Sequence, residues 1–188
     1  MQSRGNPPRP STRTRRRAIP ALLIATALVL TAVIASPVDA GHRRSTPIRG
    51  AGEWIDVRLD IEDPTDGARY VVRGRTGSGK TKIRLQVAGI EGQRGRTFGV
   101  HVHVGPCVEG DGAAAGPHFN ITGGDVVSPE TEIWLGVEID RRGRGRSRSR
   151  VEFEINADIA KSIVIHEQPT APDGAAGARL ACLPLQFG

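Results

Sequence analysis

The sequence lacks several features that mark common protein classes. It has only two cysteines in 188 residues, so it can form no more than one disulfide. After residue 40 it shows little of the 3.6-residue periodicity of amphipathic helices, which argues against a helical domain. Its one long apolar run, residues 19–35, has seventeen residues and is at the lower limit for a membrane span. These absences leave a small domain built mainly of β-strands as the expectation.

The first forty residues resemble an export signal. Six arginines precede the apolar run, and Val38-Asp39-Ala40 provides small residues where a signal peptidase would cut. We predict a signal peptide over residues 1–40, with cleavage near Ala40 and export as the outcome. A retained membrane anchor is the alternative. We further expect residues 41–52, which are basic and rich in Pro and Gly, to be a flexible lead-in to a domain over residues 53–188.

The mature part has almost no excess charge of either sign. The chain's net charge is +6, but the first forty residues hold six arginines and one aspartate, which leaves +1 for the rest. Despite the high isoelectric point, the mature protein is therefore not predicted to bind nucleic acid. About 148 residues are enough for one domain with its own core.

The two cysteines, Cys107 and Cys182, are expected to pair. In an oxidising compartment a single disulfide is the simplest use for two cysteines, and two unrelated buried thiols are the alternative. The bond would close a long loop, which stabilises the fold by roughly 4 to 5 kcal/mol on the chain-entropy model.

Alternating apolar residues predict about eight short strands, at residues 53–62, 69–75, 82–87, 97–104, 131–140, 151–155, 162–167 and 179–186. In residues 82–87 the inward side chains are expected to be Ile83, Leu85 and Val87. Pro184 suggests an edge or an early end to the last strand. The fold class predicted from these strands is all-β, a sandwich or barrel of about eight strands.

Two segments between strands carry misleading or ambiguous patterns. Residues 74–81, GRTGSGKT, match the letters of a phosphate-binding loop, but the chain continues as an alternating strand, so we predict a hairpin turn and no nucleotide.

The run RRGRGRSRSR, Arg141 to Arg150, has six arginines and is predicted to be a hairpin tip. It is either simply solvated or a weak contact for polyanions such as cell-surface glycans.

Three of the five histidines lie within residues 98–120. His101 and His103 are two apart, so on a strand both imidazoles leave the same face, as two ligands of one metal require. His118 follows after a Gly/Ala-rich loop that can present a third nitrogen. This stretch predicts most of a metal site.

Four segments together resemble the Cu/Zn superoxide dismutase family: FGVHVH, AGPHFN, SIVIHE and GARLAC, at residues 98–103, 115–120, 162–167 and 177–182. The resemblance implies copper ligation by His101, His103, His118 and His166, and catalytic roles for Arg179, which holds the superoxide anion, and His118, which is the proton-linked ligand. Four imidazoles suit copper, which is reduced and reoxidised as superoxide becomes dioxygen and hydrogen peroxide. The resemblance also implies the fold of that family, an eight-stranded antiparallel Greek-key barrel or sandwich.

The chain departs from the family where zinc would bind. No histidine lies between His118 and His166, so a normal zinc site is not expected and the resemblance is to a copper-only branch. There a carboxylate can hold the free side of the bridging histidine. Glu130 and Glu132 are the nearest candidates, with Asp125 a weaker one, and all three could instead be surface acids.

The function predicted is therefore an exported copper superoxide dismutase, a monomer or weak dimer. Two alternatives remain: a copper-buffering domain without useful turnover, and an adhesion module that uses the arginine-rich run. The loop from His166 to Arg179 is short and contains no lysine or arginine, so steering of superoxide is expected to be weak.

Overall fold

The computed structural model describes residues 45–61 and 63–188. The predicted signal peptide and cleavage site lie outside the described residues. Within the described part of the chain, no helix is long and apolar enough to cross a membrane.

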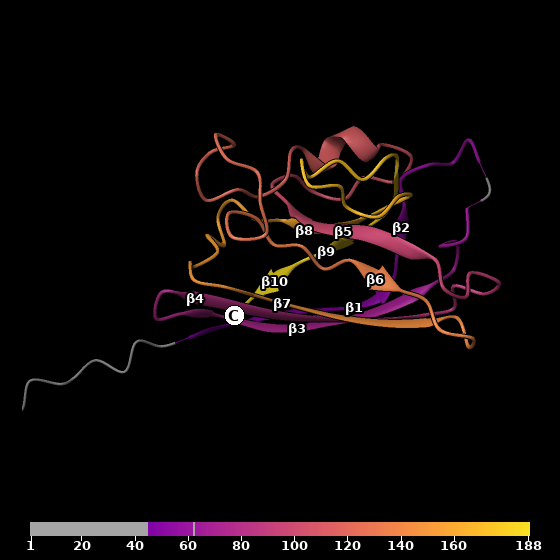
Figure 1. Ribbon diagram of the computed structural model, residues 1–188, viewed down its shortest axis with the longest axis horizontal. Helices are drawn as coiled ribbons and strands as arrows, with labels where there is room; N and C mark the ends of the chain where they lie inside the picture. The colour runs from indigo at the N-terminus through magenta and orange to yellow at the C-terminus, as the bar shows by residue number, and fades with distance from the viewer. Residues whose placement is uncertain (1–44, 62) are drawn as a thin grey trace, which may run out of the picture. The chain divides into compact units, whose positions relative to one another are not determined.

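Two five-stranded antiparallel sheets face each other and form a sandwich, as predicted (Figure 1). The first sheet has the order β10 (Gln186–Phe187), β1 (Thr46–Glu53), β3 (Arg69–Gly77), β4 (Lys80–Ala88) and β7 (Arg144–Val151). The second has the order β2 (Ile55–Asp56), β9 (Arg179–Pro184), β8 (Ser162–His166), β5 (Thr97–His103) and β6 (Val137–Glu138). The described residues thus form ten strands where eight are predicted, and three of the ten, β2, β6 and β10, have only two residues each.

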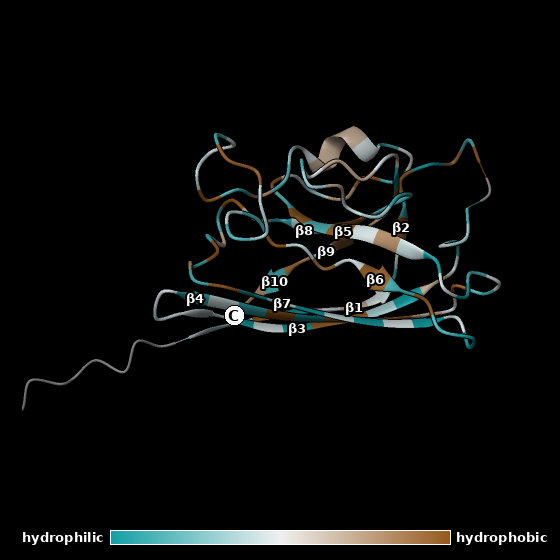
Figure 2. Cartoon of the chain, viewed as in Figure 1, coloured by the Kyte–Doolittle hydropathy of each residue, from teal (hydrophilic) through white to brown (hydrophobic). Residues whose placement is uncertain are grey.

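Alternation of side chains explains β3 and β4 of the first sheet. In β4 the inward residues Ile83, Leu85 and Val87 are buried, as predicted, while Lys82 and Arg84 between them are exposed. The hydropathy of the strands alternates accordingly (Figure 2). The second sheet is different, because β8 and all but the first residue of β5 are buried on both faces. Loops cover the outer face of this sheet (Figure 1). His101, His103 and His166 of this sheet are buried.

The predicted flexible lead-in is wrong for residues 46–52, which form most of β1. This strand pairs with β3 along its whole length, and Ile48 is completely buried. The domain therefore begins before residue 53. The strand was hidden because it has almost no hydrophobic alternation. Gly50, which suggested a loop, lies where a Cβ atom would come within 3.0 Å of the Pro184 carbonyl oxygen.

The strand predicted over residues 53–62 is also wrong. Only β2 forms, and Leu59 and Ile61, which should face inward, are 63% and 43% exposed. The chain turns instead because the carboxylate of Asp56 accepts a hydrogen bond from the backbone N–H of Arg58, at 2.7 Å.

The phosphate-loop pattern is a hairpin, as predicted. β3 and β4 pair up to Gly77 and Lys80, and the two residues between them, Ser78 and Gly79, have φ values of 56° and 74°. Two consecutive positive φ angles are typical of the tight turn that matches the twist of paired strands. The chain enters β4 directly after this turn, so no helix begins here.

The prediction that the arginine-rich run is a hairpin tip is wrong. Most of the run forms β7, which pairs with β4 over eight residues. The turn is shorter: Asp140 accepts hydrogen bonds from the backbone N–H groups of Arg142 and Arg144, at 2.7 and 3.0 Å. The flanking strands predicted at residues 131–140 and 151–155 shrink to β6 and to Val151 alone. The inward residues of β7 are mostly Gly and Ser, so the strand shows no hydrophobic alternation.

Candidate metal centre

Four histidines converge on the outer side of the second sheet. His101 and His103 lie on β5, His166 ends β8, and His118 follows in the covering loop, where it forms a β-bridge with His103. One nitrogen of each ring lies within 4.8 Å of one nitrogen of every other. The rings of His101, His103 and His166 are buried, and His118 is half-buried. The structure therefore brings together all four histidines predicted as copper ligands.

Oxygen atoms fix one nitrogen of three of these rings. Nδ1–H of His103 donates to the Gly116 carbonyl at 3.0 Å, and Nδ1–H of His166 donates to the Gly177 carbonyl at 3.3 Å. Nδ1–H of His118 donates to a carboxylate oxygen of Glu132 at 2.9 Å. Carbonyl and carboxylate oxygens only accept, so the proton is on Nδ1 in each ring and Nε2 carries a free lone pair.

The free nitrogens fit a metal ion. Nε2 of His103 and Nε2 of His166 are 3.2 Å apart, so two lone pairs face each other. His101 is oriented the other way: its Nε2 contacts the hydroxyl of Thr170 at 2.8 Å, and its Nδ1 is buried without a hydrogen-bond partner. Buried lone pairs without donors are costly, and one cation at their centre would satisfy them together.

Of the three candidate carboxylates, the structure places Glu132 at the site. Its side chain is 4% exposed and accepts from three groups: His118, the indole N–H of Trp134 at 2.8 Å and the amide of Asn120 at 3.2 Å. Glu130 and Asp125 are exposed, and neither contacts His118. A buried carboxylate with three donors is well compensated and holds the ring of His118 in one orientation.

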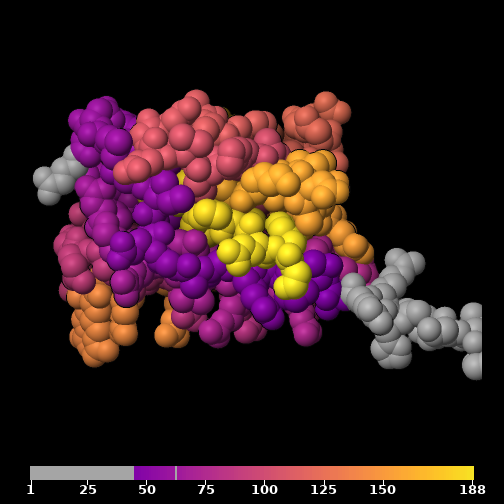
Figure 3. All heavy atoms as spheres, turned by 180° about the vertical axis from the view of Figure 1, so that it is seen from behind, coloured from indigo at the N-terminus to yellow at the C-terminus, as the bar shows by residue number. Residues whose placement is uncertain are grey.

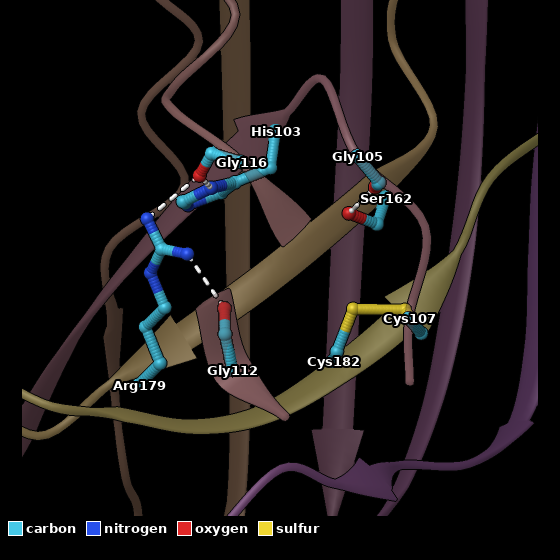
Figure 4. Close-up of a disulfide and its surroundings, with 8 residues drawn as sticks. All are labelled: His103, Gly105, Cys107, Gly112, Gly116, Ser162, Arg179 and Cys182. Atoms are coloured by element: carbon cyan, nitrogen blue, oxygen red, sulfur yellow. Dashed lines mark hydrogen bonds between the residues drawn. A yellow bond between two sulfur atoms is a disulfide. The ribbon is translucent and has the colours of Figure 1, made fainter. Parts of the chain in front are cut away.

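Arg179 lies beside the histidines at the start of β9. Its guanidinium donates from Nη1 to the Gly112 carbonyl and from Nη2 to the Gly116 carbonyl, both at 2.6 Å (Figure 4). Gly116 thus accepts from both Arg179 and His103. The side chain borders a shallow pocket that is also lined by His118 and His166. A fixed positive charge therefore lies at the opening beside two of the histidines.

The predicted disulfide is confirmed. Cys107 and Cys182 are joined, with their Cα atoms 5.5 Å apart (Figure 4). The bond ties the loop after β5 to the middle of β9, close to Arg179 and to the carbonyl groups that hold it. Nearby, the hydroxyl of Ser162 donates to the Gly105 carbonyl at 2.7 Å and fixes the start of the same loop.

The family model described as copper/zinc superoxide dismutase (SODC) matches residues 67–183. The chain belongs to this family. A comparison with curated proteins gives no match. The matched range contains the four histidines, Arg179 and both cysteines, so the family resemblance and the geometry of the site rest on the same residues.

The usual second metal site of a copper/zinc superoxide dismutase has no counterpart here among the described residues. Within residues 45–61 and 63–188, the only other group of side chains close enough to hold a metal is Asp56, Asp63 and Asp66, which contains no histidine. On the side of His118 that faces away from the cluster lies the carboxylate of Glu132.

Sequence reasoning missed the residues that support the ligands from outside. Thr170 lies in the loop after β8, and only the folding of that loop brings its hydroxyl to His101. Trp134 and Glu132 are two residues apart, and Asn120 and His118 likewise, so each pair shares one side of its extended segment. That spacing was the one signal in the sequence that could have identified Trp134 and Asn120.

Burial keeps three of the imidazoles neutral. The pKa of His101 and His103 is lowered to about 2 and that of His166 to about 4, mainly by burial and to a smaller extent by the neighbouring His118. A hydrogen bond to a backbone carbonyl partly offsets the effect of burial on the pKa of His103 and His166. At neutral pH these rings present lone pairs and no positive charge, as metal ligands must.

We expect the metal-free protein to lose stability as the pH falls below about 6.5. Unfolded histidines have a pKa near 6.5, so in this range the unfolded chain binds more protons than the folded one, and the free energy of unfolding decreases. Each of the three rings can contribute up to about 1.4 kcal/mol per pH unit. Thermal melts of the apoprotein between pH 7.5 and 5 test this. A Tm that stays constant would contradict it, and His166→Gln should give a shallower decline.

Proposed function

We propose that this chain is an exported superoxide dismutase that uses copper and no zinc. The observation that carries the proposal is the convergence of four imidazole nitrogens, three of them with the opposite nitrogen fixed by a carbonyl or carboxylate, beside the guanidinium of Arg179. Membership of the copper/zinc superoxide dismutase family supports the reaction.

His101, His103, His118 and His166 would hold the copper. Imidazoles suit both oxidation states of this metal. When bound, copper supplies the redox couple that oxidises one superoxide anion to dioxygen and reduces another to hydrogen peroxide. The chain's own part is to hold the ligands, attract the anion and manage a proton.

His118, held by Glu132, would take up and release the proton that accompanies the reaction. The carboxylate keeps the Nδ1 proton of His118 in place, so only Nε2 is free either to face the cluster or to carry an additional proton. His118 is also the most exposed of the four rings, and it borders the pocket. Glu132 would then do for this ring what zinc does elsewhere in the family, which is to fix its orientation from the far side.

Arg179 would attract and position superoxide. Its guanidinium is permanently charged, although burial lowers its pKa, and two carbonyl groups hold it at the edge of the pocket. The loop between His166 and Arg179 offers no second cation. Among the described residues, Arg179 is the only cation that lines the pocket beside His118 and His166, so it would provide most of the attraction for the substrate inside that pocket.

Export is supported by the disulfide between Cys107 and Cys182, since such bonds persist in oxidising compartments. The hydrophobic leader of the sequence agrees with this.

We expect the copper-loaded protein to accelerate superoxide decay well beyond the rate in buffer, and Arg179→Gln to reduce this rate about tenfold with copper still bound. Pulse radiolysis or a cytochrome c competition assay measures both. Arg94→Gln is the matched control, because Arg94 is exposed and does not line this pocket.

The copper-buffering alternative predicts a different outcome. One equivalent of copper would bind tightly, but superoxide would decay no faster than in buffer. The short loop before Arg179 is the feature that favours this alternative, because a site with little steering captures the substrate slowly.

A further inference from the structure

The charged residues on the outward face of the first sheet are almost all basic. Eleven of the eighteen lysine and arginine residues in the described part of the chain project from it, and the only carboxylate at an outward strand position is that of Glu53. These residues are Arg49, Arg69, Arg73, Arg75, Lys80, Lys82, Arg84, Arg144, Arg146, Arg148 and Arg150. The same residues 45–61 and 63–188 contain eighteen acids, so this part of the chain is neutral overall but its charges are segregated.

The cations form rows across the strands. Arg49, Arg73, Arg84 and Arg148 are direct partners in register over β1, β3, β4 and β7. A second row, Arg75, Lys82 and Arg150, lies two residues along. Neighbours in a row are about 5 Å apart at the backbone, and the rows are about 7 Å apart. Like charges directly opposite on neighbouring strands destabilise a sheet, so this arrangement has a cost in the isolated protein.

Little within the protein neutralises the first row. No carboxylate of the described residues lies within 4.0 Å of the charged nitrogens of Arg73, Arg84 or Arg148. At the margins of the face the situation differs: Arg150 pairs with Glu152 at 3.3 Å, and Arg69 with Glu53 at 3.0 Å. The centre of the face therefore carries uncompensated positive charge.

A groove runs between the two rows. Its floor is formed by Gly74, Ile83 and Ser149, which are partners in register, and three cations line each side. A second depression over β1 and β3 shares Arg73, Gly74 and Arg75 with it, so the groove continues across the sheet. In Figure 3 the side chains of this face project from the lower edge of the molecule as separate knobs, those of β7 in orange.

We propose that this basic groove binds a linear anionic polysaccharide. Guanidinium groups pair in fork geometry with carboxylate or sulfate groups, and two cation rows can follow the charges of one extended chain. The two rows are about 7 Å apart at the backbone, which suits one extended chain between them, whereas a nucleic-acid duplex, which is wider than its own major groove of about 12 Å, could only lie across the rows. The uncompensated charge and the groove together specify an extended polyanion.

Other anionic partners fit the face less well. Single-stranded nucleic acids usually stack on aromatic side chains, and no aromatic residue occupies an outward position on β3, β4 or β7. Membrane-surface segments insert large apolar residues, and the exposed ones of the described chain lie outside the sheet, at Leu59, Ile61, Val108, Ile121, Val126, Val127 and Ile159.

Binding here would leave the metal centre accessible. The histidines belong to the second sheet and its covering loops, whereas the groove is on the outer face of the first sheet (Figure 1). A polysaccharide held in the groove therefore does not cover the pocket beside His118 and Arg179.

The test compares two triple variants in affinity measurements on heparin and on polygalacturonate, as sulfated and carboxylated probes. Arg73→Gln, Arg84→Gln and Arg148→Gln together should weaken binding about 10- to 100-fold, and the affinity of the unaltered protein should fall steeply with salt. The control changes Arg94, Arg141 and Arg142, which are exposed in loops, to glutamine and should alter affinity less than about threefold.

Because the first variant removes like-charge contacts across the strands, its Tm should be unchanged or higher, so lost binding cannot be attributed to unfolding. The proposal is overturned if the row variant binds as tightly as the unaltered protein or if the loop control loses as much affinity. It is equally overturned if a DNA duplex or vesicles of anionic phospholipid bind more tightly than both polysaccharides.

Discussion

Replacement of His101 and His166 by alanine is expected to abolish stoichiometric copper binding. The double change removes two of the four converging nitrogens, one from β5 and one from β8, and leaves His103 and His118 alone. Altering a group that merely supports a ligand typically weakens metal affinity 10- to 100-fold, so the loss of two direct ligands should exceed about 1000-fold. Metal analysis after dialysis, together with the visible absorption of Cu(II), measures the effect.

His42→Ala is the matched control, because His42 is the one histidine of the sequence that is not among the four predicted ligands. It should retain one equivalent of copper. A far-UV circular dichroism spectrum like that of the unaltered protein would show that the double variant is folded. If the double variant still held one equivalent, the four histidines would not be the ligands.

Loss of the disulfide is expected to cause the largest change in stability. Cys107 and Cys182 are 75 residues apart, and closing a loop of that length lowers the entropy of the unfolded chain by the equivalent of roughly 4 to 5 kcal/mol. For Cys107→Ala with Cys182→Ala, the Tm should therefore fall by about 10 to 20 °C. Urea unfolding and calorimetry measure both quantities. Alanine suits this test because Cys182 is fully buried and a hydroxyl there would lack partners.

The same variant should also impair the site. The bond connects β9, which carries Arg179, to the loop that carries the carbonyls of Gly112 and Gly116. Without it, these two contacts of the guanidinium should loosen. Reduction of the unaltered protein should reproduce the stability change, and a decrease in the free energy of unfolding below about 1 kcal/mol would contradict the expectation.

The parts of the fold that the sequence revealed are those with one apolar face. β3, β4, β5 and β8 have clear patterns because their inward positions hold large hydrophobic residues. β1 and β7 have no such pattern: Gly and Ser fill the inward positions of β7 up to Val151, and β1 buries Ile48 alone among its eight residues. These strands exist because neighbouring strands supply their hydrogen bonds, which a local pattern does not record.

Some residues of the candidate metal site could be predicted from the sequence, and others could not. The four histidines were identifiable from sequence motifs. Three of them lie in FGVHVH and AGPHFN, within residues 98–120, and the fourth lies in SIVIHE, at residues 162–167. The choice between Glu130 and Glu132 was not, since both precede β6 in an irregular segment and only its backbone path decides which carboxylate turns inward. Thr170 was undetectable for a related reason: its contact with His101 depends on how a loop folds over the sheet.

The strict alternation of side chains in β3, β4 and β7 also affects how this protein can change over time. Outward positions touch neither the core nor the histidines, so a codon change there alters surface charge and leaves the chemistry of the site intact. The charge of this face can therefore change one residue at a time while the four histidines and the groups that support them stay the same.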